Sequence, residues 1–273
     1  MLLGKKGMST GTPMYVRIFK EESELELWKQ RDDGRFYLFK TYPICNWSGA
    51  LGPKVRQGDM QAPEGFYRVP QSQMNPNSQF HLAFNLGYPN TYDRANNRTG
   101  DFLMIHGKCK SAGCYAMTDA LIEEIYALAR ESFIGGQEAI HVHAFPFRMT
   151  DANLERHKSN SHHKFWLTLK EGYDFFDTAR QTPSVLVCDR KYVVNAKYSG
   201  RQALRADGVC PPLERVAPEP FTPLPMQTAE TVVAPGPKTR SAHEGSATGP
   251  AAGGSSKLGL SGGYIDGLSG FGR

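Results

Sequence analysis

The sequence has no long apolar run, few cysteines and little net charge, and each absence excludes a class of protein. None of its apolar stretches approaches the ~20 residues that span a bilayer, so a transmembrane helix is excluded. Its 5 cysteines are too few and too widely spaced for a disulfide scaffold or a CxxC zinc site. The net charge is only +5 over 273 residues, without a Lys/Arg-dense block, so no nucleic-acid partner is expected.

Proline and glycine become frequent after Cys210, which indicates where the folded part of the chain ends. Residues 211–273 combine many of both with few large apolar side chains. Such a segment cannot bury enough apolar surface to offset the entropy lost on ordering. We therefore expect a short leader remnant at 1–12, a folded domain at 13–195 and a Pro/Gly-rich, disordered tail at 196–273.

Within the expected domain, strand-like segments come first and helices follow. Runs of β-forming residues predict strands at 13–20, 25–30, 35–45, 65–69, 80–86 and 101–107, with the second and third forming a hairpin. Helical spacing of apolar residues predicts a helix that begins at Thr118–Asp119 and ends at Gly135–Gly136. A strand at 140–147, two further helices and a closing strand at 184–194 complete the domain. This order predicts an α+β fold, mainly β, with few helices.

The segment 101–119 contains the residues best suited to covalent catalysis. His106 and Gly107 end a predicted strand, and Gly113 and Cys114 follow shortly before the predicted helix. A helix N-terminus favours the thiolate, and a nearby imidazole can take the thiol proton and return it to a leaving amine. Gly113 lets the backbone approach a carbonyl closely, so N–H groups of this turn are expected to hold an oxyanion. The spacing predicts a Cys/His acyl-transfer site.

Two other interpretations of these thiols stay open. Free cysteine is among the most buried residue types, so Cys114 also fits a small, inert apolar side chain. Cys109 is a second candidate nucleophile, or a reversible disulfide partner of Cys114. Ser111 fits a hydrogen bond that supports the nucleophile better than it fits a nucleophile of its own.

Several other polar residues fit structural roles as well as functional ones. Arg94 and Arg98 precede the catalytic strand, and Arg98 is the better candidate for binding a substrate carboxylate. Five histidines lack a neighbouring cysteine or carboxylate at ligand spacing, so no metal site is expected among them: His141, His143, His157, His162 and His163. One of the alternating pair His141 and His143 is a candidate neighbour of the catalytic cleft.

Three ordered blocks of the sequence resemble the YkuD-type L,D-transpeptidase catalytic domain, most closely its YafK-like branch. They are GDMQAPEGFYRV at 58–69, YDRANNRTGDFLMIHG at 92–107, and the Ser-Ala-Gly-Cys motif at 111–114 that follows His106–Gly107. Two positions depart from the wider family. Ala112 stands where a histidine usually precedes the Gly-Cys pair, and the arginine that commonly follows the cysteine by two is missing.

The resemblance implies an enzyme that acts on peptidoglycan stem peptides, often at diaminopimelate, without a metal or organic cofactor. Cys114 would form a thioacyl-enzyme, with His106 as general base and then acid. Gly113 and Cys114 N–H groups would hold the oxyanion, supported by Ser111 and Gly107, while Arg98 and Tyr115 would bind substrate. An amine acceptor would make it a transpeptidase, and water an amidase or hydrolase that trims stems or releases a linked lipoprotein. A non-catalytic cell-wall-binding module is the third possibility.

The resemblance also implies a location in the periplasm or cell envelope. No signal peptide is present in the sequence as given, because Met1 lies close to the first predicted strand. We therefore expect the natural gene to extend upstream into a signal peptide or membrane anchor; a stop codon immediately before Met1, with no alternative start, would contradict this. In an oxidising compartment Cys188 and Cys210 are candidates for a disulfide.

Overall fold

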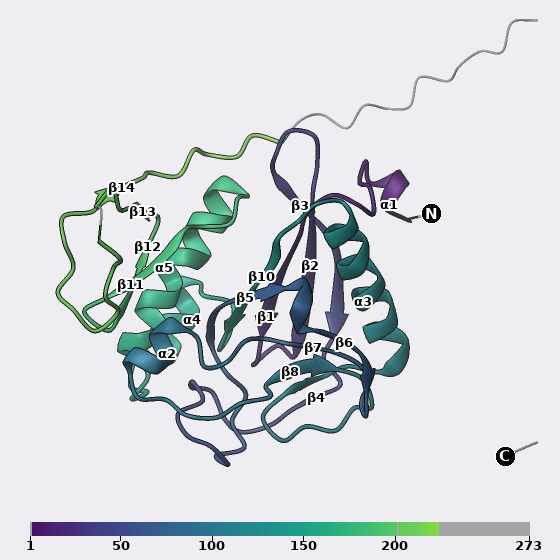
Figure 1. The fold of residues 1–273 in the computed structure, drawn as a ribbon, viewed down its shortest axis with the longest axis horizontal. Helices are drawn as coiled ribbons and strands as arrows, with labels where there is room; N and C mark the ends of the chain where they lie inside the picture. The colour runs from purple at the N-terminus through teal and green to yellow at the C-terminus, as the bar shows by residue number, and fades with distance from the viewer. Residues whose placement is uncertain (1, 201, 224–273) are drawn as a thin grey trace, which may run out of the picture. The chain divides into compact units, whose positions relative to one another are not determined.

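Two five-stranded sheets enclose the main apolar core in the computed structural model, which describes residues 2–200 and 202–223 (Figure 1). Sheet 1 has the order β3-β2-β1-β10-β5 and consists of β1 (Met14–Phe19), β2 (Glu24–Gln30), β3 (Phe36–Pro43), β5 (Gly65–Pro70) and β10 (Ala139–Phe145). Sheet 2 has the order β4-β9-β8-β7-β6 and consists of β4 (Asn46–Trp47), β6 (Met74–Ser78), β7 (His81–Asn85), β8 (Met104–His106) and β9 (Tyr115–Ala116). The predicted α+β class is confirmed.

Strand β1 is central to sheet 1 because it is buried on both faces. All six of its residues are buried, as expected for a strand covered on each side. It pairs antiparallel with β2 and parallel with β10. The expected hairpin is confirmed, since β2 pairs antiparallel with β3.

Helix α3 (Asp119–Ile134) packs against sheet 2 and closes the core. Thr118 caps its N-terminus by accepting a hydrogen bond from the Leu121 N–H, and Gly135 ends it, as the sequence predicts. Ile122 and Ile125 are buried with residues from both sheets. Figure 1 shows α3 and the longer α5 (His163–Ala179) on opposite sides of the strands of sheet 1.

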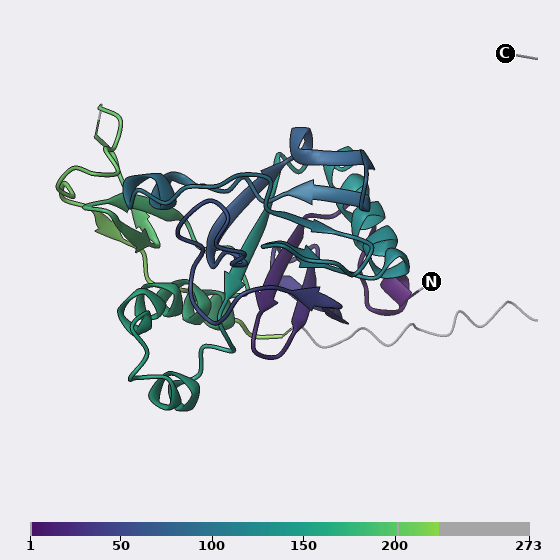
Figure 2. The same cartoon turned by 90° about the horizontal axis from the view of Figure 1, so that it is seen from below.

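The second apolar cluster lies on the other face of sheet 1. Trp166, Leu169 and Tyr173 of α5 pack there with Phe19 and Phe145 of the sheet. The short helix α4 (Asp151–Arg156) precedes α5 and contributes Leu154 to the same cluster. Seen from below, both helices lie on one side of sheet 1 (Figure 2). Sheet 1 therefore has a buried cluster on each face: the main core toward sheet 2, and the second cluster toward α4 and α5.

The prediction of a single closing strand at 184–194 is wrong, because this segment forms a hairpin of two strands. Strands β11 (Val185–Cys188) and β12 (Lys191–Val194) pair antiparallel across a two-residue turn. Asp189 and Arg190 in this turn both have positive φ, 50° and 56°. Such turns usually contain glycine or asparagine, so this sequence gives no local signal for one.

The folded unit continues beyond the predicted boundary at 195. Strands β13 (Ala196–Lys197) and β14 (Glu214–Arg215) pair, and the compact unit extends to Pro223. At the other end, the expected leader remnant packs onto the domain. It forms α1 (Leu2–Lys5), buries Met8 and accepts a hydrogen bond from Lys29 Nζ at the Thr10 carbonyl. The rest of the expected tail, 224–273, lies outside the described residues.

Two short elements complete the described fold, η1 (Gln71–Gln73) and α2 (Thr91–Ala95). Helix α2 starts with a capping box, in which the Asn90 and Asp93 side chains each accept the other residue's backbone N–H. No helix in the described ranges is long and apolar enough to cross a membrane.

Candidate active site

His106 ends β8, and Cys114 directly precedes β9, the strand that pairs with β8. Strands β8 and β9 are parallel, with Ile105 opposite Tyr115, and both of these side chains are buried in the main core. Since alternate side chains point to opposite faces, His106 and Cys114 both project from the outer face of sheet 2. One strand spacing and two residues of offset separate their Cα atoms by roughly 8 Å. The two residues are therefore neighbours on sheet 2, and among the described residues their side chains bond to other partners, the Gly107 and Phe102 carbonyls.

The imidazole of His106 is oriented as a proton acceptor. Its Nδ1 lies 2.6 Å from the Gly107 carbonyl oxygen, which can only accept, so Nδ1 carries the proton. The neutral ring therefore presents an unprotonated Nε2. The Phe80 ring packs 4.8 Å from the imidazole, centroid to centroid, and His106 is only 2% exposed. Burial lowers the pKa of His106 below its ordinary value of 6.5, which keeps the ring neutral at neutral pH.

Cys114 is a protonated thiol in this environment. It is half-buried, and its Sγ donates to the Phe102 carbonyl oxygen at 3.6 Å. Burial raises the pKa of the thiol above the ordinary 9.0, and the Met104 N–H and the Lys54 charge oppose this only in part. The expected help from a helix N-terminus is wrong, because β9 follows Cys114 and α3 begins only at Asp119. Activation of the thiol therefore depends on a base.

Two serine hydroxyls hold the turn that carries Cys114. The N–H of Gly113 donates to Ser48 Oγ at 2.6 Å, and the N–H of Cys114 donates to Ser111 Oγ at 3.1 Å. Ser111 Oγ in turn donates to the Cys114 carbonyl at 2.7 Å, and Ser48 Oγ donates to the Met60 carbonyl at 2.7 Å. The two N–H groups expected to hold an oxyanion thus already have acceptors, which corrects the view of them as free donors.

Glycine is required at position 113 for two reasons. Its φ of +106° is one that residues with a side chain rarely adopt. A Cβ there would also lie 3.2 Å from Leu103 Cδ1 and 3.4 Å from the Gln61 carbonyl oxygen. The turn is therefore packed tightly against the 58–69 block. Ser48 and Lys54 were missed by the sequence analysis, since no motif marks either of them.

If Cys114 is the nucleophile that the family resemblance implies, replacing Ser48 with alanine is expected to lower kcat about tenfold, because the Cys114 turn loses its anchor at Gly113. The measurement is muropeptide turnover, with circular dichroism to verify folding. Ser184→Ala is the matched control, since Ser184 Oγ makes one long hydrogen bond, 3.4 Å to the Ala196 carbonyl. Equal kcat for the two variants would contradict the anchoring role.

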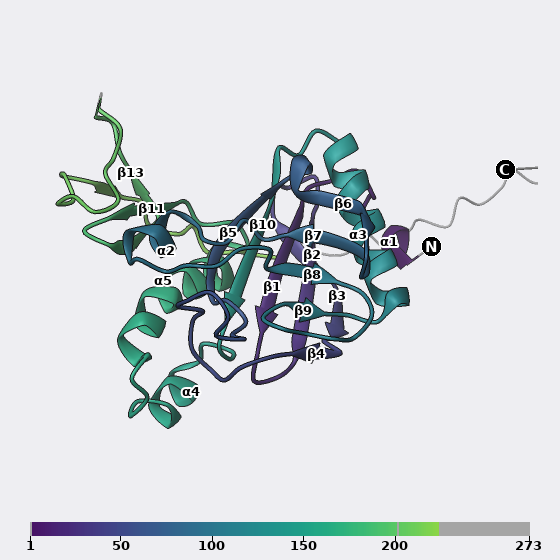
Figure 3. The ribbon, with the colours of Figure 1, turned by 60° about the horizontal axis from the view of Figure 1, so that its bottom comes forward.

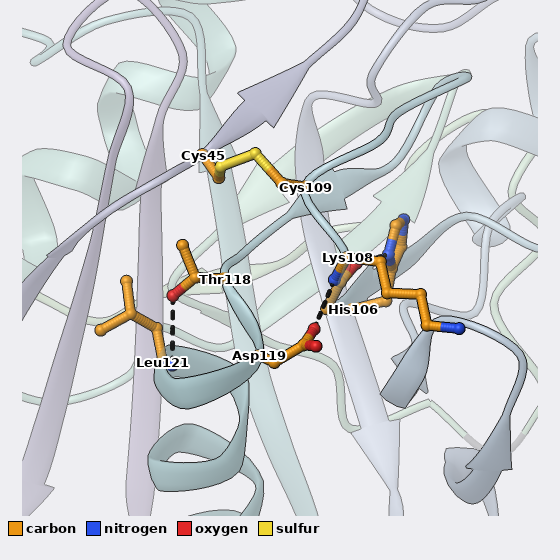
Figure 4. The surroundings of a disulfide bond; sticks show 8 residues. Cys45, His106, Lys108, Cys109, Thr118, Asp119 and Leu121 are labelled. Carbon is orange, nitrogen blue, oxygen red and sulfur yellow. Dashed lines mark hydrogen bonds between the residues drawn. A yellow bond between two sulfur atoms is a disulfide. The ribbon is translucent and has the colours of Figure 1, made fainter.

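A disulfide fixes the turn that follows His106. Cys109 bonds to Cys45, so it is neither the nucleophile nor a partner of Cys114, and that prediction is wrong. Lys108 and Cys109 have positive φ, 62° and 52°. Figure 4 shows this turn between the disulfide and Asp119, whose carboxylate accepts the Lys108 N–H at 2.7 Å. Gly107 is needed here because a Cβ would lie 2.6 Å from Asp119 Oδ1.

Removing the Cys45–Cys109 disulfide with two alanines is expected to reduce the free energy of unfolding by about 2–4 kcal/mol. The bond closes a long loop, with a sequence separation of 64, so it restricts the unfolded chain strongly. Urea unfolding measures the loss. The double alanine variant of Cys188 and Cys210, with a separation of 22, is the control and is expected to lose less. A larger loss in the control would contradict the prediction.

Two predicted substrate-binding residues are structural in this protein. Tyr115 is fully buried, and its hydroxyl donates to the Pro63 carbonyl at 2.6 Å. The Arg98 side chain is 9% exposed and forms an ion pair with buried Asp93 at 2.9 Å. Neither side chain is free to contact a substrate, which corrects both assignments. By contrast, Phe102 next to the thiol is 67% exposed.

The pair His141 and His143 lies away from this site. His143 is packed against Phe66 and Tyr15 on the face of sheet 1 opposite sheet 2, so neither member of the His141/His143 pair neighbours the thiol. Among the described residues, no group of three or more His, Cys, Asp or Glu side chains is arranged to hold a metal ion.

The sequence model of the YkuD family, described as the L,D-transpeptidase catalytic domain, matches residues 13–142. A protein of Escherichia coli strain K12 named "Putative L,D-transpeptidase YafK" is 47% identical over 189 residues, which make up 69% of this chain and 76% of that protein. The chain belongs to the YkuD L,D-transpeptidase family. The protein of the same name from Escherichia coli O157:H7 matches to the same extent.

Solved structures are similar at lower identity. A mutant of the helical cell shape determining protein Pgp2 from Campylobacter jejuni is 19% identical, with a TM-score of 0.41, over 65% of this chain and 62% of that chain. Bd1075 from Bdellovibrio bacteriovorus is also 19% identical, with a TM-score of 0.34, over 61% of this chain and 57% of that one. The YkuD-family chain thus spans less than two thirds of either structure, and no residue role follows from these likenesses.

Proposed function

We propose that this YkuD-family protein is a cysteine acyltransferase that acts on peptidoglycan stem peptides through Cys114. The observation that carries the proposal is the placement of the one unpaired cysteine on the same sheet face as a neutral histidine with an available Nε2. The other four cysteines form two disulfides. Membership of the L,D-transpeptidase family supports peptidoglycan as the substrate.

The reaction proceeds by two acyl transfers. His106 Nε2 takes the Cys114 proton as Sγ attacks the carbonyl of the third stem residue, often diaminopimelate. The tetrahedral intermediate then expels the amine of the next residue, which receives the proton from His106 and leaves a thioester on Cys114. An acceptor amine, deprotonated by His106, attacks this thioester and releases the Cys114 thiol. If water replaces the amine, the same steps give hydrolysis.

The electrostatics favour a neutral thiol and imidazole over a preformed ion pair. Burial raises the pKa of Cys114 and lowers that of His106, so at neutral pH the proton remains on sulfur until the substrate is bound. Proton transfer and attack on the carbonyl therefore occur together. Under this proposal the Cys114 N–H donates to the oxyanion after Ser111 Oγ has moved away from it, whereas Ser48 keeps its hydrogen bond with the Gly113 N–H and holds the turn.

Alkylation of Cys114 by iodoacetamide is expected to accelerate mainly above pH 9, because only the thiolate reacts and its pKa is raised. Turnover of muropeptides is expected to fall only below pH 6.5, where His106 becomes protonated and can no longer act as a base. Intact mass measured at several pH values follows the alkylation, and Cys114→Ala corrects for other sites. An alkylation rate that already reaches its plateau near pH 7 would contradict the neutral-pair mechanism.

Both disulfides support a location in the periplasm or cell envelope. Structural disulfides form and persist in oxidising compartments and are rare in reducing ones. Cys188 and Cys210 pair as the sequence suggested. The cell wall, on which the family acts, lies in such a compartment.

Product analysis with defined muropeptides tests the proposal. Tetrapeptide muropeptides containing diaminopimelate are incubated with the protein, with and without a D-amino acid as acceptor, and analysed by liquid chromatography and mass spectrometry. A new amide to the acceptor indicates a transpeptidase, whereas only shortened stems indicate a hydrolase. A muropeptide with a linked lipoprotein peptide tests release of that partner. If the protein is folded and the muropeptides remain unchanged, acyl transfer is contradicted, and a non-catalytic cell-wall-binding module becomes the favoured function.

A further inference from the structure

A cavity away from Cys114 lies at the β5 edge of sheet 1, mainly on the face that carries His141 and His143. It has a volume of about 370 Å³ and is lined by residues of β5, β10, α2 and β11. Figure 3 shows α2 beside β11 at this edge of the domain. Volumes of this size fall within the range of small-molecule sites.

The alternation of side chains along β10 separates this cavity from the active site. Val142 and Ala144 point into the main core, which they share with Ile105 and Tyr115 of sheet 2. His141 and His143 therefore point to the opposite face, and both line the cavity. A ligand here would not contact Cys114, because no residue of the 101–119 segment lines the cavity among the described residues.

His143 gives the cavity an unpartnered buried donor. The residue is fully buried, and its Nδ1 lies 2.8 Å from the hydroxyl of Tyr15, which is also fully buried. A buried phenol needs an acceptor for its O–H, so Tyr15 donates to Nδ1 and the proton of the neutral ring is on Nε2. Nε2 has no hydrogen-bond partner among the described residues. The lining of the cavity thus includes an N–H that lacks an acceptor.

Two arginines make the cavity positive. Arg68 stands opposite His141 in the β5–β10 register and lies on the same face, although it also pairs with exposed Glu138. Arg94 of α2 bonds only to the Pro89 carbonyl and to Thr91 Oγ1, and within the described ranges it has no acidic partner. In the part of the chain that the structure describes, no aspartate or glutamate lines the cavity. Arg94 was the less favoured of the two arginines in the sequence.

We propose that this cavity binds the carboxylate of a small organic ligand. Arg94 supplies the charge, and the His143 Nε2–H, which is covered in this structure, donates to a carboxylate oxygen once the ligand has displaced the side chains over it. A single unpaired guanidinium beside neutral histidines matches one negative charge better than the two of a phosphate. Phe66 and Val185 provide an apolar wall for the rest of the ligand. An acidic sugar and the C-terminal residue of a peptide share this chemistry.

Nuclear magnetic resonance of the full chain labelled with ¹⁵N-histidine tests the proposal with two matched pairs of probes. Glucuronate is compared with glucose, and N-acetylalanine with its amide, so that each pair differs at the carboxylate. We expect one or both carboxylates to shift the His143 ring signals, and both neutral probes to leave them unchanged. The carboxylate that binds more tightly identifies the source, sugar or peptide.

Variants then assign the binding. Arg94→Gln is expected to weaken the carboxylate about tenfold, whereas Arg130→Gln, which removes an exposed charge from α3, is expected to have no effect. Cys114→Ala is expected to bind as the wild type does, which separates this site from the proposed acyl transfer. The proposal is overturned if neither carboxylate shifts His143 up to about 10 mM. Equal binding of a neutral probe, or unchanged affinity in Arg94→Gln, would overturn it as well.

Discussion

Replacing Cys114 with alanine is expected to lower the rate of muropeptide turnover by about 10⁴-fold or more, to the level of the background reaction. The reason is that every bond change in the proposed mechanism passes through its sulfur. The fold is expected to survive, because the thiol makes one long hydrogen bond, 3.6 Å to the Phe102 carbonyl. Turnover is measured under saturating substrate, and far-ultraviolet circular dichroism checks the fold.

Two further variants distinguish the loss of the Cys114 thiol from the loss of another cysteine and from the loss of the base. Cys109→Ala removes a cysteine of the same segment that is already bonded to Cys45, so it is expected to keep most of its activity while losing stability. His106→Gln keeps a hydrogen-bonding side chain but removes the base, and is expected to lose about 10²–10⁴-fold. A Cys114→Ala variant with more than about a tenth of wild-type turnover would contradict covalent catalysis by this residue.

Replacing Glu64 with alanine is expected to destabilise the domain by about 3–5 kcal/mol, because it leaves a buried ammonium without its counter-charge. Glu64 and Lys20 both have fully buried side chains and form an ion pair at 2.9 Å. Glu64 also accepts the Gly52 N–H at 2.7 Å and the Trp166 Nε1–H at 2.8 Å. Lys20 Nζ in turn donates to the carbonyls of Gly52 and Ala62.

Urea unfolding with an unchanged m-value measures this loss. Glu155→Ala is the control, since Glu155 and Lys158 form an ion pair with side chains 68% and 65% exposed, worth less than about 1 kcal/mol. Glu64 also ties the 52–64 segment to α5 through Trp166, and a Cβ on Gly113 would meet the Gln61 carbonyl oxygen of that segment at 3.4 Å. A loss for Glu64→Ala as small as that of the control would contradict this role.

Local patterns predicted the elements that position the site. The spacing of apolar residues after Thr118 sets α3, and the cap hydrogen bond involves only Thr118 and Leu121. The β2–β3 hairpin likewise depends on neighbouring residues. The short connection between β8 and β9 keeps His106 and Cys114 near one another, although strand β9 itself was not predicted. Each of these features is fixed within a few tens of residues of sequence.

Features that depend on distant residues could not be predicted. The Cys45–Cys109 pairing spans a sequence separation of 64. The Ser48 hydroxyl, which accepts the Gly113 N–H, lies directly after β4, 65 residues earlier in the chain. Arg98 looked available in the sequence, but Asp93, itself fully buried, pairs with it. Tyr115 follows Cys114 directly and still points into the core, because successive side chains of an extended segment point to opposite faces.

Trapping of the acyl-enzyme tests the central claim most directly. Wild-type protein and Cys114→Ala are incubated with tetrapeptide muropeptides and, separately, with a carbapenem, and their intact masses are measured before peptide mapping. Acyl transfer through Cys114 predicts an added mass on the wild type alone, mapped to the peptide that contains Cys114. Folded wild-type protein without any adduct and without turnover, or an equal adduct on Cys114→Ala, would contradict it.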